Sequence, residues 1–491
     1  MSQSIAIAPE GSYAPASPAS GPAAEPHHRI TAGRLIAFAS LGMPLAAVEV
    51  PLSTYVPPLY ASAFGFNLAT VGLIFLAARL WDALIDPAIG LLSDRTRSRF
   101  GRRRPWIAVG GVIFAVGAVP VFLPPVWFGP VALSAALFTL YLGYSMIATP
   151  FSAWGGELSA QYHERTRVAT YQQVMTSLAL LLALVLPSLL VHRFAGLPRL
   201  QLAAMGAMVL ILLVPSLAIG LRALPEPEPG PPATGPIRLV QTLRLVLAER
   251  LLLRVLASNF AVRLGQGVRT ALFVFFVSHY MGRPSWAPGL FLLQYIFGIV
   301  ACPIWLAVGR RLGKERAAVA GELTQVVINL ALLLLAPNSI ALLLGLTVAQ
   351  GLAQGSGNLM LRSIVADVAD QHRLWAEEDR IGLFYSVFAL SDKAAFAVAV
   401  GVALPLVSWL GFDPRHANPP LVLAHLKWAF ALGPALAHLL SAALIRGFPL
   451  NEQRHGEIRR ALAARDAAGL FSDPARERWL ADEECQGPDR A

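Results

Sequence analysis

The feature that most constrains this chain is a stretch of apolar residues, uninterrupted by turns or charge clusters, that recurs along most of its length. A helix of about 20 apolar residues crosses a hydrocarbon core of about 30 Å. We expect twelve such spans, at residues 34–59, 67–92, 106–124, 129–157, 168–192, 200–222, 251–280, 287–308, 317–336, 339–365, 381–410 and 421–446. The chain is therefore predicted to be an all-α membrane protein.

Composition supports this prediction and excludes two large classes of protein. Hydrophobic residues make up 56% of the 491 residues and charged residues only 14%, against roughly a quarter in ordinary soluble domains. Too few polar side chains remain to cover a conventional cytosolic enzyme or to solvate a disordered scaffold. Two cysteines, Cys302 and Cys485, cannot form a disulfide framework or a cysteine-rich metal site.

The expected spans divide into two sets of six. Residues 1–33 are rich in Ala, Pro, Ser and Gly, lack the apolar core of a signal peptide and are predicted to form a disordered tail. Residues 34–222 hold the first six spans and residues 251–446 the other six. A linker at 223–250 contains the run PEPEPGPPATGP, which cannot span, and its last part is a candidate interfacial helix. Residues 447–491 form a charged tail, for which a solvated position near the membrane is expected.

Charge in the short loops predicts the orientation. One set of loops carries fourteen Lys and Arg residues between 95 and 380, and the opposite set carries four. Because basic loops stay in the cytoplasm, we expect both termini and the linker to be cytoplasmic. The net charge of +10 is explained by these anchoring loops, and no nucleic-acid partner is expected. Basic loops also occupy matching positions in the two halves, which favours a duplicated six-helix unit.

The second span and the loop after it carry the most specific motif in the chain. Trp81, Asp82, Asp86, Pro87 and Gly90 precede SDRTRSRFGRRRPW at 93–106. This pattern resembles the glycoside-pentoside-hexuronide:cation symporter family of the major facilitator superfamily, typified by the melibiose carrier. The segments YSMIATPFSAWGGELS at 144–159, HERTR at 163–167, ADVADQH at 366–372 and YSVFALSDK at 385–393 are similar to further family segments. The resemblance implies two six-helix bundles and cation-coupled transport.

Asp82 and Asp86 are the strongest candidate site residues. They are four apart on a helix, so both carboxylates project from one face, which Arg79 shares. Carboxylates are costly toward lipid and normally face the interior of a bundle. Two acids beside one arginine leave a surplus negative charge, which could hold Na⁺ as a metal ligand pair or could retain a proton. The alternative is a buried ion-pair cluster that joins helices. The resemblance implies cation coupling.

Ser145 and Lys393 complete the proposed cation site by resemblance. The family places a hydroxyl on the fourth span near the cation, and Ser145 falls there; the alternative is a serine that packs helix against helix. Lys393 falls on the family's intramembrane lysine, which implies an electrostatic contact with the aspartates of the second span. The alternative is that Asp392 and Lys393 neutralise each other locally.

Polar residues in the seventh and tenth spans are candidate substrate contacts. Spacings of three and four place Asn259, Arg263, Gln266 and Arg269 on roughly one helix face, as they do for a second set in the tenth span. Such faces suit a wet cavity, although hydrogen bonds between helices are the commoner explanation. The predicted substrate cavity consists of Gln173, Arg263, Gln266, Gln350, Gln354 and Asn358.

The basic loop after the second span is the predicted cytoplasmic gate. By analogy with the superfamily its charged residues are expected to latch the two halves, and Gly101 allows a tight turn; anchoring of the topology is the plain alternative. The gate residues are Asp94, Arg95, Gly101, Arg102, Arg103 and Arg104.

Four positions depart from the family's galactoside carriers. The two acids that grip the sugar there fall on Ala46 and Ala148, an arginine falls on Gln173, and the stacking tryptophan falls on Ser152. The cation half of the family site is therefore kept and the galactoside half is absent.

The expected function is cation-coupled symport of a small solute, a sugar or glycoside, with Na⁺ or H⁺ as the coupling ion and no other cofactor. The expected location is the plasma membrane, or the inner membrane of a bacterium, and the expected state is a monomer in the bilayer. Two alternatives stay open: a symporter of a non-sugar solute, and a non-transporting assembly protein on the same fold. We find no GxSxG, HExxH, CxxC or phosphate-loop motif and expect no enzyme activity.

Overall fold

The computed structural model describes residues 30–158, 162–193, 197–226, 247–376 and 381–467. Every regular element within these ranges is helical. The elements are α1 (Ala32–Ala39), η1 (Ser40–Gly42), α2 (Met43–Val50), η2 (Pro51–Tyr55), α3 (Val56–Ser62), α4 (Leu68–Arg95), α5 (Arg104–Phe122), α6 (Pro130–Glu157), α7 (Tyr162–Arg193), α8 (Pro198–Ala223), α10 (Arg250–Phe275), η3 (Phe276–Tyr280), η4 (Pro284–Trp286), α11 (Ala287–Leu312), α12 (Lys314–Ala331), η5 (Leu332–Leu334), α13 (Ile340–Ala376), α14 (Ile381–Trp409), α15 (Pro420–Ile445) and α16 (Glu452–Ala467).

Twelve of these helices or joined helix groups are long and apolar enough to cross a membrane, which confirms the predicted fold class. Their bounds agree with the expected spans to within four residues, apart from the tenth. That helix was expected to end at residue 365 but its span continues to Trp375. The extension persists because its apolar residues, among them Val368 and Ala369, stay buried on one helical face.

The first span is broken by its prolines. α1, α2 and α3 are separated by η1 and η2, and η2 is a single wide turn that begins at Pro51. Proline donates no backbone hydrogen bond and its ring crowds the preceding turn, so the helix widens locally to continue. The chain thereby crosses as one bent span.

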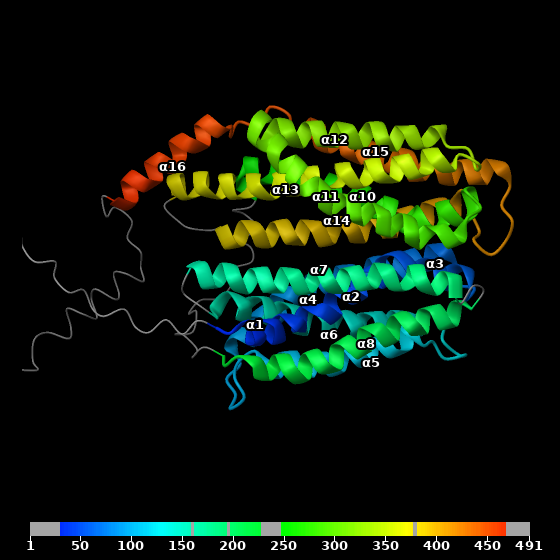
Figure 1. Cartoon of the computed structure of the whole chain (residues 1–491), viewed down its shortest axis with the longest axis horizontal. Helices are drawn as coiled ribbons and strands as arrows, with labels where there is room; N and C mark the ends of the chain where they lie inside the picture. Colours follow the sequence, from blue (N-terminus) through cyan, green and yellow to red (C-terminus); the bar gives the residue numbers. More distant parts are fainter. Residues whose placement is uncertain (1–29, 159–161, 194–196, 227–246, 377–380, 468–491) are drawn as a thin grey trace, which may run out of the picture.

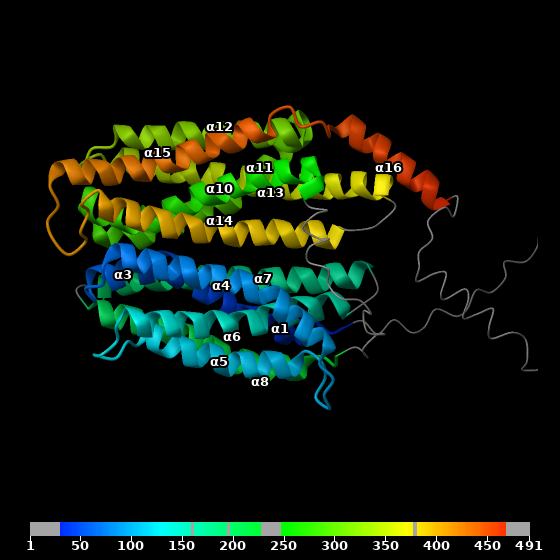
Figure 2. The same cartoon turned by 180° about the vertical axis from the view of Figure 1, so that it is seen from behind.

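The twelve spans form two bundles that lie side by side. Figures 1 and 2 show α1 to α8 in one layer and α10 to α15 in the other. The layers meet where α4 lies along α14 and where α7 lies along α11. The bundle division therefore follows the expected boundary at the linker, whose residues 227–246 lie outside the described part of the chain, as does most of the expected interfacial helix.

Glycines allow α5 and α6 to pack at close range. A Cβ added to Gly143 on α6 would overlap the backbone of Phe114, and one added to Gly110 on α5 would lie 2.7 Å from the Cβ of Met146. Small residues at a helix interface let two backbones approach, which is a common way to pack helices within a membrane. This seam stiffens the first bundle around α4.

The two ends of the molecule are packed differently. At the end far from the termini, one apolar cluster includes buried residues of both bundles, among them Val56 and Leu404. There Gly72 and Gly401 make room for Leu404 and Leu76 across the bundle boundary, because an added Cβ would lie 2.9 and 2.6 Å from the Cβ atoms of those leucines. Toward the terminal end the described apolar clusters do not cross the bundle boundary: the shared cluster extends along the first bundle as far as Leu35, and the other two clusters each lie within one bundle. The bundles are thus joined at the far end.

A polar contact also crosses the bundle boundary at the far end. Arg415, in the loop between α14 and α15, donates to the carbonyl oxygen of Gly65 at 3.4 Å. Its guanidinium also forms an ion pair with Asp413 at 2.8 Å, and hydrogen bonds from Arg415 hold the pKa of that carboxyl well below its usual range. Asp413 therefore stays ionised at neutral pH and orients Arg415 toward the opposite bundle.

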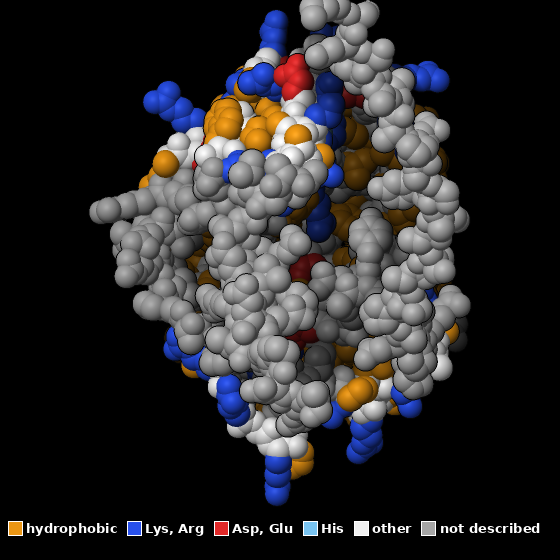
Figure 3. Space-filling model, turned by 90° about the vertical axis from the view of Figure 1, so that its left-hand side faces the viewer, with side chains coloured by type: hydrophobic (Ala, Val, Ile, Leu, Met, Phe, Trp, Pro, Cys, Tyr) orange, Lys and Arg blue, Asp and Glu red, His pale blue; other side chains and the backbone are white. Residues whose placement is uncertain are grey.

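The terminal end is rimmed by basic side chains. Figure 3 views this end and shows Lys and Arg around its edge. α16 lies here, and its Ile458 and Leu462 are buried against the second bundle. This part of the predicted tail is docked and not fully solvated, because two apolar residues one turn apart need a packing partner. The disordered-tail prediction falls largely on residues 1–29, and these lie outside the described part, as do residues 468–491.

Candidate functional site

The two aspartates lie on the inner face of α4, near the middle of the helix. The helix begins after Asn67, whose side chain accepts hydrogen bonds from the backbone of Ala69 and Thr70. Asp82 is fully buried, while the side chain of Asp86 is 28% exposed. Pro87 follows Asp86 directly and donates no hydrogen bond to the previous turn. The local helix is therefore weakened next to the more accessible carboxylate.

Lys393 on α14 bridges these carboxylates across the bundle boundary. Its Nζ lies 2.5 Å from Oδ2 of Asp86 and 2.9 Å from Oδ2 of Asp82, the second contact being an ion pair without hydrogen-bond geometry. Ser145 on α6 is fully buried and donates to Oδ1 of Asp82 at 2.8 Å. The structure brings together all four residues predicted for the cation site.

Thr149 is a site residue that the sequence interpretation missed. It lies one turn after Ser145 on α6, and its hydroxyl lies 3.5 Å from Oδ1 of Asp86. Each aspartate thus has one hydroxyl neighbour on α6. The spacing of four in both pairs was a usable signal, since residues four apart on each of two adjacent helices can contact in register.

Arg79 does not neutralise the aspartates as the sequence suggested. It forms an ion pair with Glu49 at 2.7 Å instead, and its guanidinium lies over the ring of Tyr141. Glu49 comes from α2 in the first span, so this ion pair joins the first span to α4. Two carboxylates and one ammonium remain in the cluster, so its formal charge is −1 when all three are ionised. The predicted surplus of negative charge persists with Lys393 as the counterion.

Asp392 does not pair with its neighbour Lys393. Its carboxylate accepts from Arg263 at 2.8 and 3.2 Å and from Asn259 at 2.7 Å, both on α10. Local neutralisation is therefore wrong. Consecutive residues on a helix point about 100° apart, so the two charges face different helices.

Five of the six predicted substrate contacts lie close together in the second bundle. Gln266 accepts from Arg263 at 3.3 Å and from Asn358 at 3.4 Å. Gln266, Gln350 and Gln354 also line a small cavity of about 60 Å³ between α10, α11 and α13. Arg263, Gln266 and Asn358 are thus hydrogen-bonded to one another beside Asp392, and Gln350 and Gln354 meet Gln266 around the cavity.

Gln173 is separate from these five residues. It lies on α7 in the first bundle, is exposed, and donates to Ser177 of the same helix at 3.3 Å. Ser152 on α6 is exposed as well. No contact among the described residues joins Gln173 to the other predicted substrate residues in this conformation.

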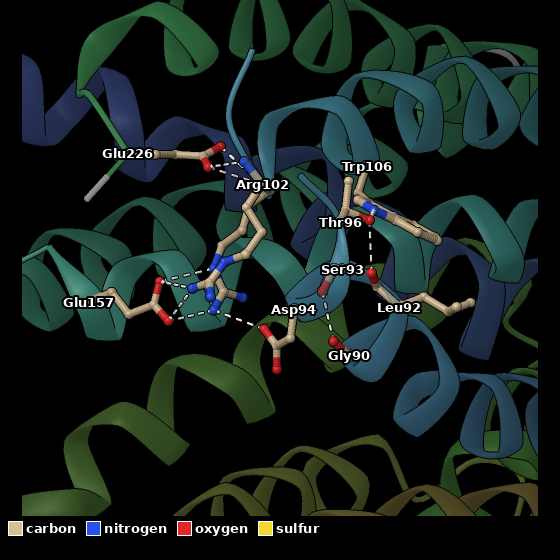
Figure 4. A network of polar contacts seen from close by, with 10 residues as sticks. Gly90, Leu92, Ser93, Asp94, Thr96, Arg102, Trp106, Glu157 and Glu226 are labelled. Carbon is tan, nitrogen blue, oxygen red and sulfur yellow. Dashed lines mark hydrogen bonds and ion pairs between the residues drawn. The ribbon is translucent and has the colours of Figure 1, made fainter. Parts of the chain in front are cut away.

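The basic loop between α4 and α5 fastens the first bundle. Figure 4 shows Arg102 reaching Glu157 at the end of α6, with the Glu226 carboxylate against the backbone of the loop. Glu226 accepts from the backbone N–H groups of residues 102–104 at 2.5 to 3.0 Å, and Arg103 contacts both Asp94 and Glu157. Gly101 has a φ of 105°, which glycine adopts readily.

In this conformation the described contacts of the gate residues do not latch the two halves, so their role as a cytoplasmic gate stays a prediction. These contacts link α4, α5, α6 and the segment after α8, and none of those described reaches the second bundle. Arg95 is exposed at the end of α4, and Arg104 donates to the carbonyl oxygen of Leu224. The sequence interpretation missed Glu226, because this residue lies in a proline-rich linker with no helical pattern. Its negative charge was the one feature that could have indicated a contact with the basic loop.

The donor set around Lys393 suits a small hard cation. Carboxylate and hydroxyl oxygens are the ligands of alkali and alkaline-earth ions, whereas transition metals favour nitrogen and sulfur. Among the described residues no group of three or more His, Cys, Asp or Glu side chains could hold a metal ion. A bound cation would therefore rely on Asp82, Asp86 and the two hydroxyls of α6.

Comparison with known proteins places this site in context. The chain is similar to the sodium-dependent lysophosphatidylcholine symporter 1 of Homo sapiens, with 24% identity over 83% of this chain and 81% of that protein. It is also similar to the protein named "Putative glycoside/cation symporter YagG" of Escherichia coli, with 25% identity over 83% of this chain and 90% of that protein.

Solved structures show the same architecture. A mutant form of the nucleoside transporter NupG matches with a TM-score of 0.63 at 13% identity over 84% of this chain and 98% of that chain. The family model described as "MFS/sugar transport protein" matches residues 37–452. That range includes all twelve spans, except for the first few residues of the first span. The chain therefore belongs to this family of major facilitator transporters.

Proposed function

We propose that this protein is a secondary transporter that couples the movement of a cation, Na⁺ or H⁺, to that of a small solute. The observation that carries the proposal is the single ammonium of Lys393 held by two aspartates of the opposite bundle. A cation that binds Asp82 and Asp86 competes with Lys393 for the same oxygens. Cation binding therefore breaks the ion pairs between Lys393 of the second bundle and the two aspartates of the first. A change in contacts between the bundles is required for a solute to cross the membrane.

The exchange of partners supplies the coupling. When the cation replaces the ammonium, one ion-pair link between α4 and α14 is lost while the apolar contacts at the far end remain. Lys393 becomes free to interact with a bound solute or with Tyr144, whose ring lies 5.9 Å from Nζ. By linkage, a solute that binds better to the cation-loaded state raises cation affinity equally.

A sugar or glycoside is the solute class we propose first. The matched family is described as a sugar transport family, and one relative is named for glycoside and cation symport. The carboxamides near Arg263 offer donors and acceptors of the kind that bind hydroxyl groups. Galactosides of the melibiose type are not expected, because Ala46 and Ala148 provide no acid to accept from their hydroxyls. A relative named for lysophosphatidylcholine makes a non-sugar solute the second candidate.

The wider setting follows from the same proposal. We place the protein in the plasma membrane, or in the inner membrane of a bacterium, as a monomer with both termini cytoplasmic. The structure is then closed on the outer side. No enzyme activity, nucleic-acid binding or cofactor beyond the coupling ion is part of the proposal. Both named relatives are symporters, which favours transport over an assembly role.

Cation binding tests the proposal without knowledge of the solute. Purified protein is titrated with labelled sodium, and proton uptake is followed in a parallel sample. The variants Asp82→Asn and Asp86→Asn keep the shape of each side chain but remove its charge, and we expect each to lower cation binding at least tenfold. Asp367→Asn is the matched control, because Asp367 pairs with Lys314 at the terminal end.

The outcome separates the two roles open to the aspartate pair. Loss in both site variants, with the control unchanged and all three proteins folded, supports a coupling site. Folded site variants that bind sodium and protons like the parent would show that the pair only joins helices. Parent protein that binds neither ion would contradict the proposal itself.

A further inference from the structure

Arg269 is a buried cation that the proposed cation site does not use. It lies on α10, six residues beyond Arg263, and is only 6% exposed. One terminal nitrogen donates to Oδ1 of Asn329 on α12 at 3.0 Å, and the guanidinium lies 5.1 Å from the ring centre of Phe430 on α15. Its Nε is buried and has no hydrogen-bond partner. The group is therefore only partly satisfied.

No carboxylate of the described residues compensates this charge. Among the described residues Arg269 forms no ion pair, and the acids within the same bundle are already engaged. Asp392 forms an ion pair with Arg263, and Asp367 forms one with Lys314. The carboxylate of Glu322 lies 2.6 Å from the imidazole of His438. Burial of an unpaired charge costs several kcal/mol. A neutral asparagine and one aromatic ring recover only part of that cost.

The cavity of about 60 Å³ lies directly beside Arg269. Four glutamines and a threonine lie near its guanidinium, and the wall is completed by Phe273, Phe291 and Tyr295; the polar lining residues are Gln266, Thr270, Gln294, Gln350 and Gln354. The space holds a few water-sized groups. It fits a carboxylate or phosphate but not a whole glycoside.

Unpaired amide atoms occur at Gln350, which lines the cavity, and at its partner Gln325. Of these, Nε2 of Gln325 is a donor that suits an oxyanion, whereas Oε1 of Gln350 is an acceptor that suits a hydroxyl or a water. Gln350 donates to Oε1 of Gln325 at 2.6 Å, which leaves Oε1 of Gln350 and Nε2 of Gln325 buried without partners. Gln294 donates to Gln354 at 2.9 Å across the cavity wall. Native proteins rarely leave buried polar atoms unpaired unless a ligand or water completes them.

We propose that Arg269 and these carboxamides bind an oxyanion of the transported solute, a carboxylate or a phosphate. A guanidinium presents a planar fork of donors that matches the oxygens of either group. The assignment rests on the proposed transport function and defines its substrate class: an acidic sugar derivative or a phosphate-bearing lipid, with the remainder of the solute extending out of the cavity.

The subsite is connected to the cation site through side chains. Gln266 lines the cavity and accepts from Arg263, which holds Asp392, the neighbour of Lys393 in the chain. Two side-chain contacts, Gln266 to Arg263 and Arg263 to Asp392, thus lead from the cavity beside Arg269 to the residue that precedes Lys393. The negative charge of an anion at Arg269 also balances the cation that enters with it, so the two substrates can stabilise each other.

A purely structural role for Arg269 makes a different prediction. Arg269 then serves to join α10 to Asn329 and Phe430, and the cavity needs no anion. Asn329→Asp separates the two cases, because it keeps the shape of residue 329 and places a carboxylate beside the guanidinium. Whether Arg269 is structural or binds an anion, Asn329→Asp should raise the thermal unfolding midpoint. Only an anion-binding role predicts that the new carboxylate also prevents an anion from binding.

The experiment measures binding to purified full-length protein by calorimetry and by the shift of the thermal unfolding midpoint. The probes are glucuronate against glucose for a sugar acid, and lysophosphatidylcholine against monoolein for a lipid phosphate. We expect one charged probe to bind better than its neutral partner, and Arg269→Gln and Asn329→Asp each to weaken it at least tenfold. Arg269→Lys should weaken it less, and Arg222→Gln, at an exposed arginine on α8, should leave it unchanged.

Each result decides the inference. The pair of probes that responds identifies the source of the oxyanion. The inference would be overturned if neither charged probe binds the parent, or if the charged and neutral probes bind equally in both pairs. Unchanged binding by folded Asn329→Asp would also overturn it. If Arg269→Gln does not fold, Asn329→Asp alone decides. Asp82→Asn should retain anion binding in the absence of sodium, so loss of cation coupling and loss of the subsite are distinguished.

Discussion

Lys393 shows how much of the site depends on a single charge. Its ammonium is the only described cation in direct contact with Asp82 and Asp86, and it comes from the opposite bundle. Arg79 lies on the same helix as the aspartates but is occupied by Glu49. Under the proposed function, the affinity for a coupling cation is therefore set by competition between that cation and one lysine.

We expect Lys393→Gln to bind sodium about tenfold more tightly than the parent. The substitution removes the competing ammonium and changes the formal charge of the cluster from −1 to −2, and opposite charges a few ångströms apart attract by about 4 kcal/mol at an effective dielectric constant near 20. Coupled transport should nevertheless slow, since the ammonium no longer returns to release the cation. Sodium titration and counterflow measure the two effects.

The control for this prediction is Lys427→Gln. Lys427 lies on α15, and its ammonium donates to the carbonyl oxygen of Leu333 without a carboxylate partner in the described structure. Its removal should leave sodium affinity unchanged. Weaker sodium binding by folded Lys393→Gln would contradict the competition.

At the scale of elements, the first bundle is held by helix contacts that admit little change in side-chain size. The α5–α6 seam places the backbones of residues 114 and 143 almost in contact. α4, which carries the aspartates, packs on another face of α6, where Ser145 and Thr149 meet it. The geometry of the cation site therefore depends on the closeness of this seam.

We expect Gly143→Ala to lower the thermal unfolding midpoint by several degrees. Its new methyl group would overlap the backbone of Phe114, which cannot rotate away as a side chain can, so the two helices must separate. Overpacking of this kind typically costs about 1–3 kcal/mol. Thermal unfolding of the purified protein measures the shift, and sodium affinity should fall with it.

Gly156→Ala is the matched control on the same helix. An added Cβ at Gly156 meets no atom within 4 Å, and alanine favours a helix by up to about 1 kcal/mol over glycine. The control should therefore be neutral or slightly stabilising. Equal destabilisation by both variants would show that the α5–α6 seam is not the cause.

At the scale of the whole molecule, the two bundles are joined at one end and separate in their packing at the other. The shared apolar cluster and the Arg415 contact lie at the far end. The charges of the gate loop stay within the first bundle. Under the proposed transport function, the structure represents one of the two states that alternating access requires, and the other state opens the far end.

A cross-link at the far end tests this motion. Gly72→Cys combined with Leu404→Cys places two thiols close together, since a Cβ at residue 72 would lie 2.9 Å from that of Leu404. A disulfide needs about 3.5–4.5 Å between Cβ atoms, which a small shift provides. We expect oxidation to form the bond and to abolish cation-dependent exchange, and reductant to restore it.

The single-cysteine variants, treated with the same oxidant, control for damage to other residues. They should retain exchange. A cross-linked protein that still exchanges at the parental rate would show that the far end does not open during the cycle. Native Cys302, which is exposed, is replaced in all of these proteins.

The sequence alone predicted the twelve spans, their division into two sets and the position of Asp82 and Asp86 on one inward-facing side of a helix. These features are local: the length of an apolar run decides whether a helix spans, and spacing along one helix decides which side chains share a face. The helix ends were accurate because prolines, glycines and charges lie at the boundaries. The tenth span was the exception, because an amphipathic helix can continue in water against a partner that the local pattern does not reveal.

Partner choice between helices was decided only by the tertiary structure. Glu49 forms an ion pair with Arg79, and Asp392 forms one with Arg263. Lys393 pairs with the two aspartates of the other bundle. Each charge had more than one possible partner in the sequence, and the distances that select among them depend on helix bends and bundle packing. The sequence determined that charges would be buried in this membrane protein. The fold determined which of them neutralise each other, and it places no carboxylate of the described residues against Arg269.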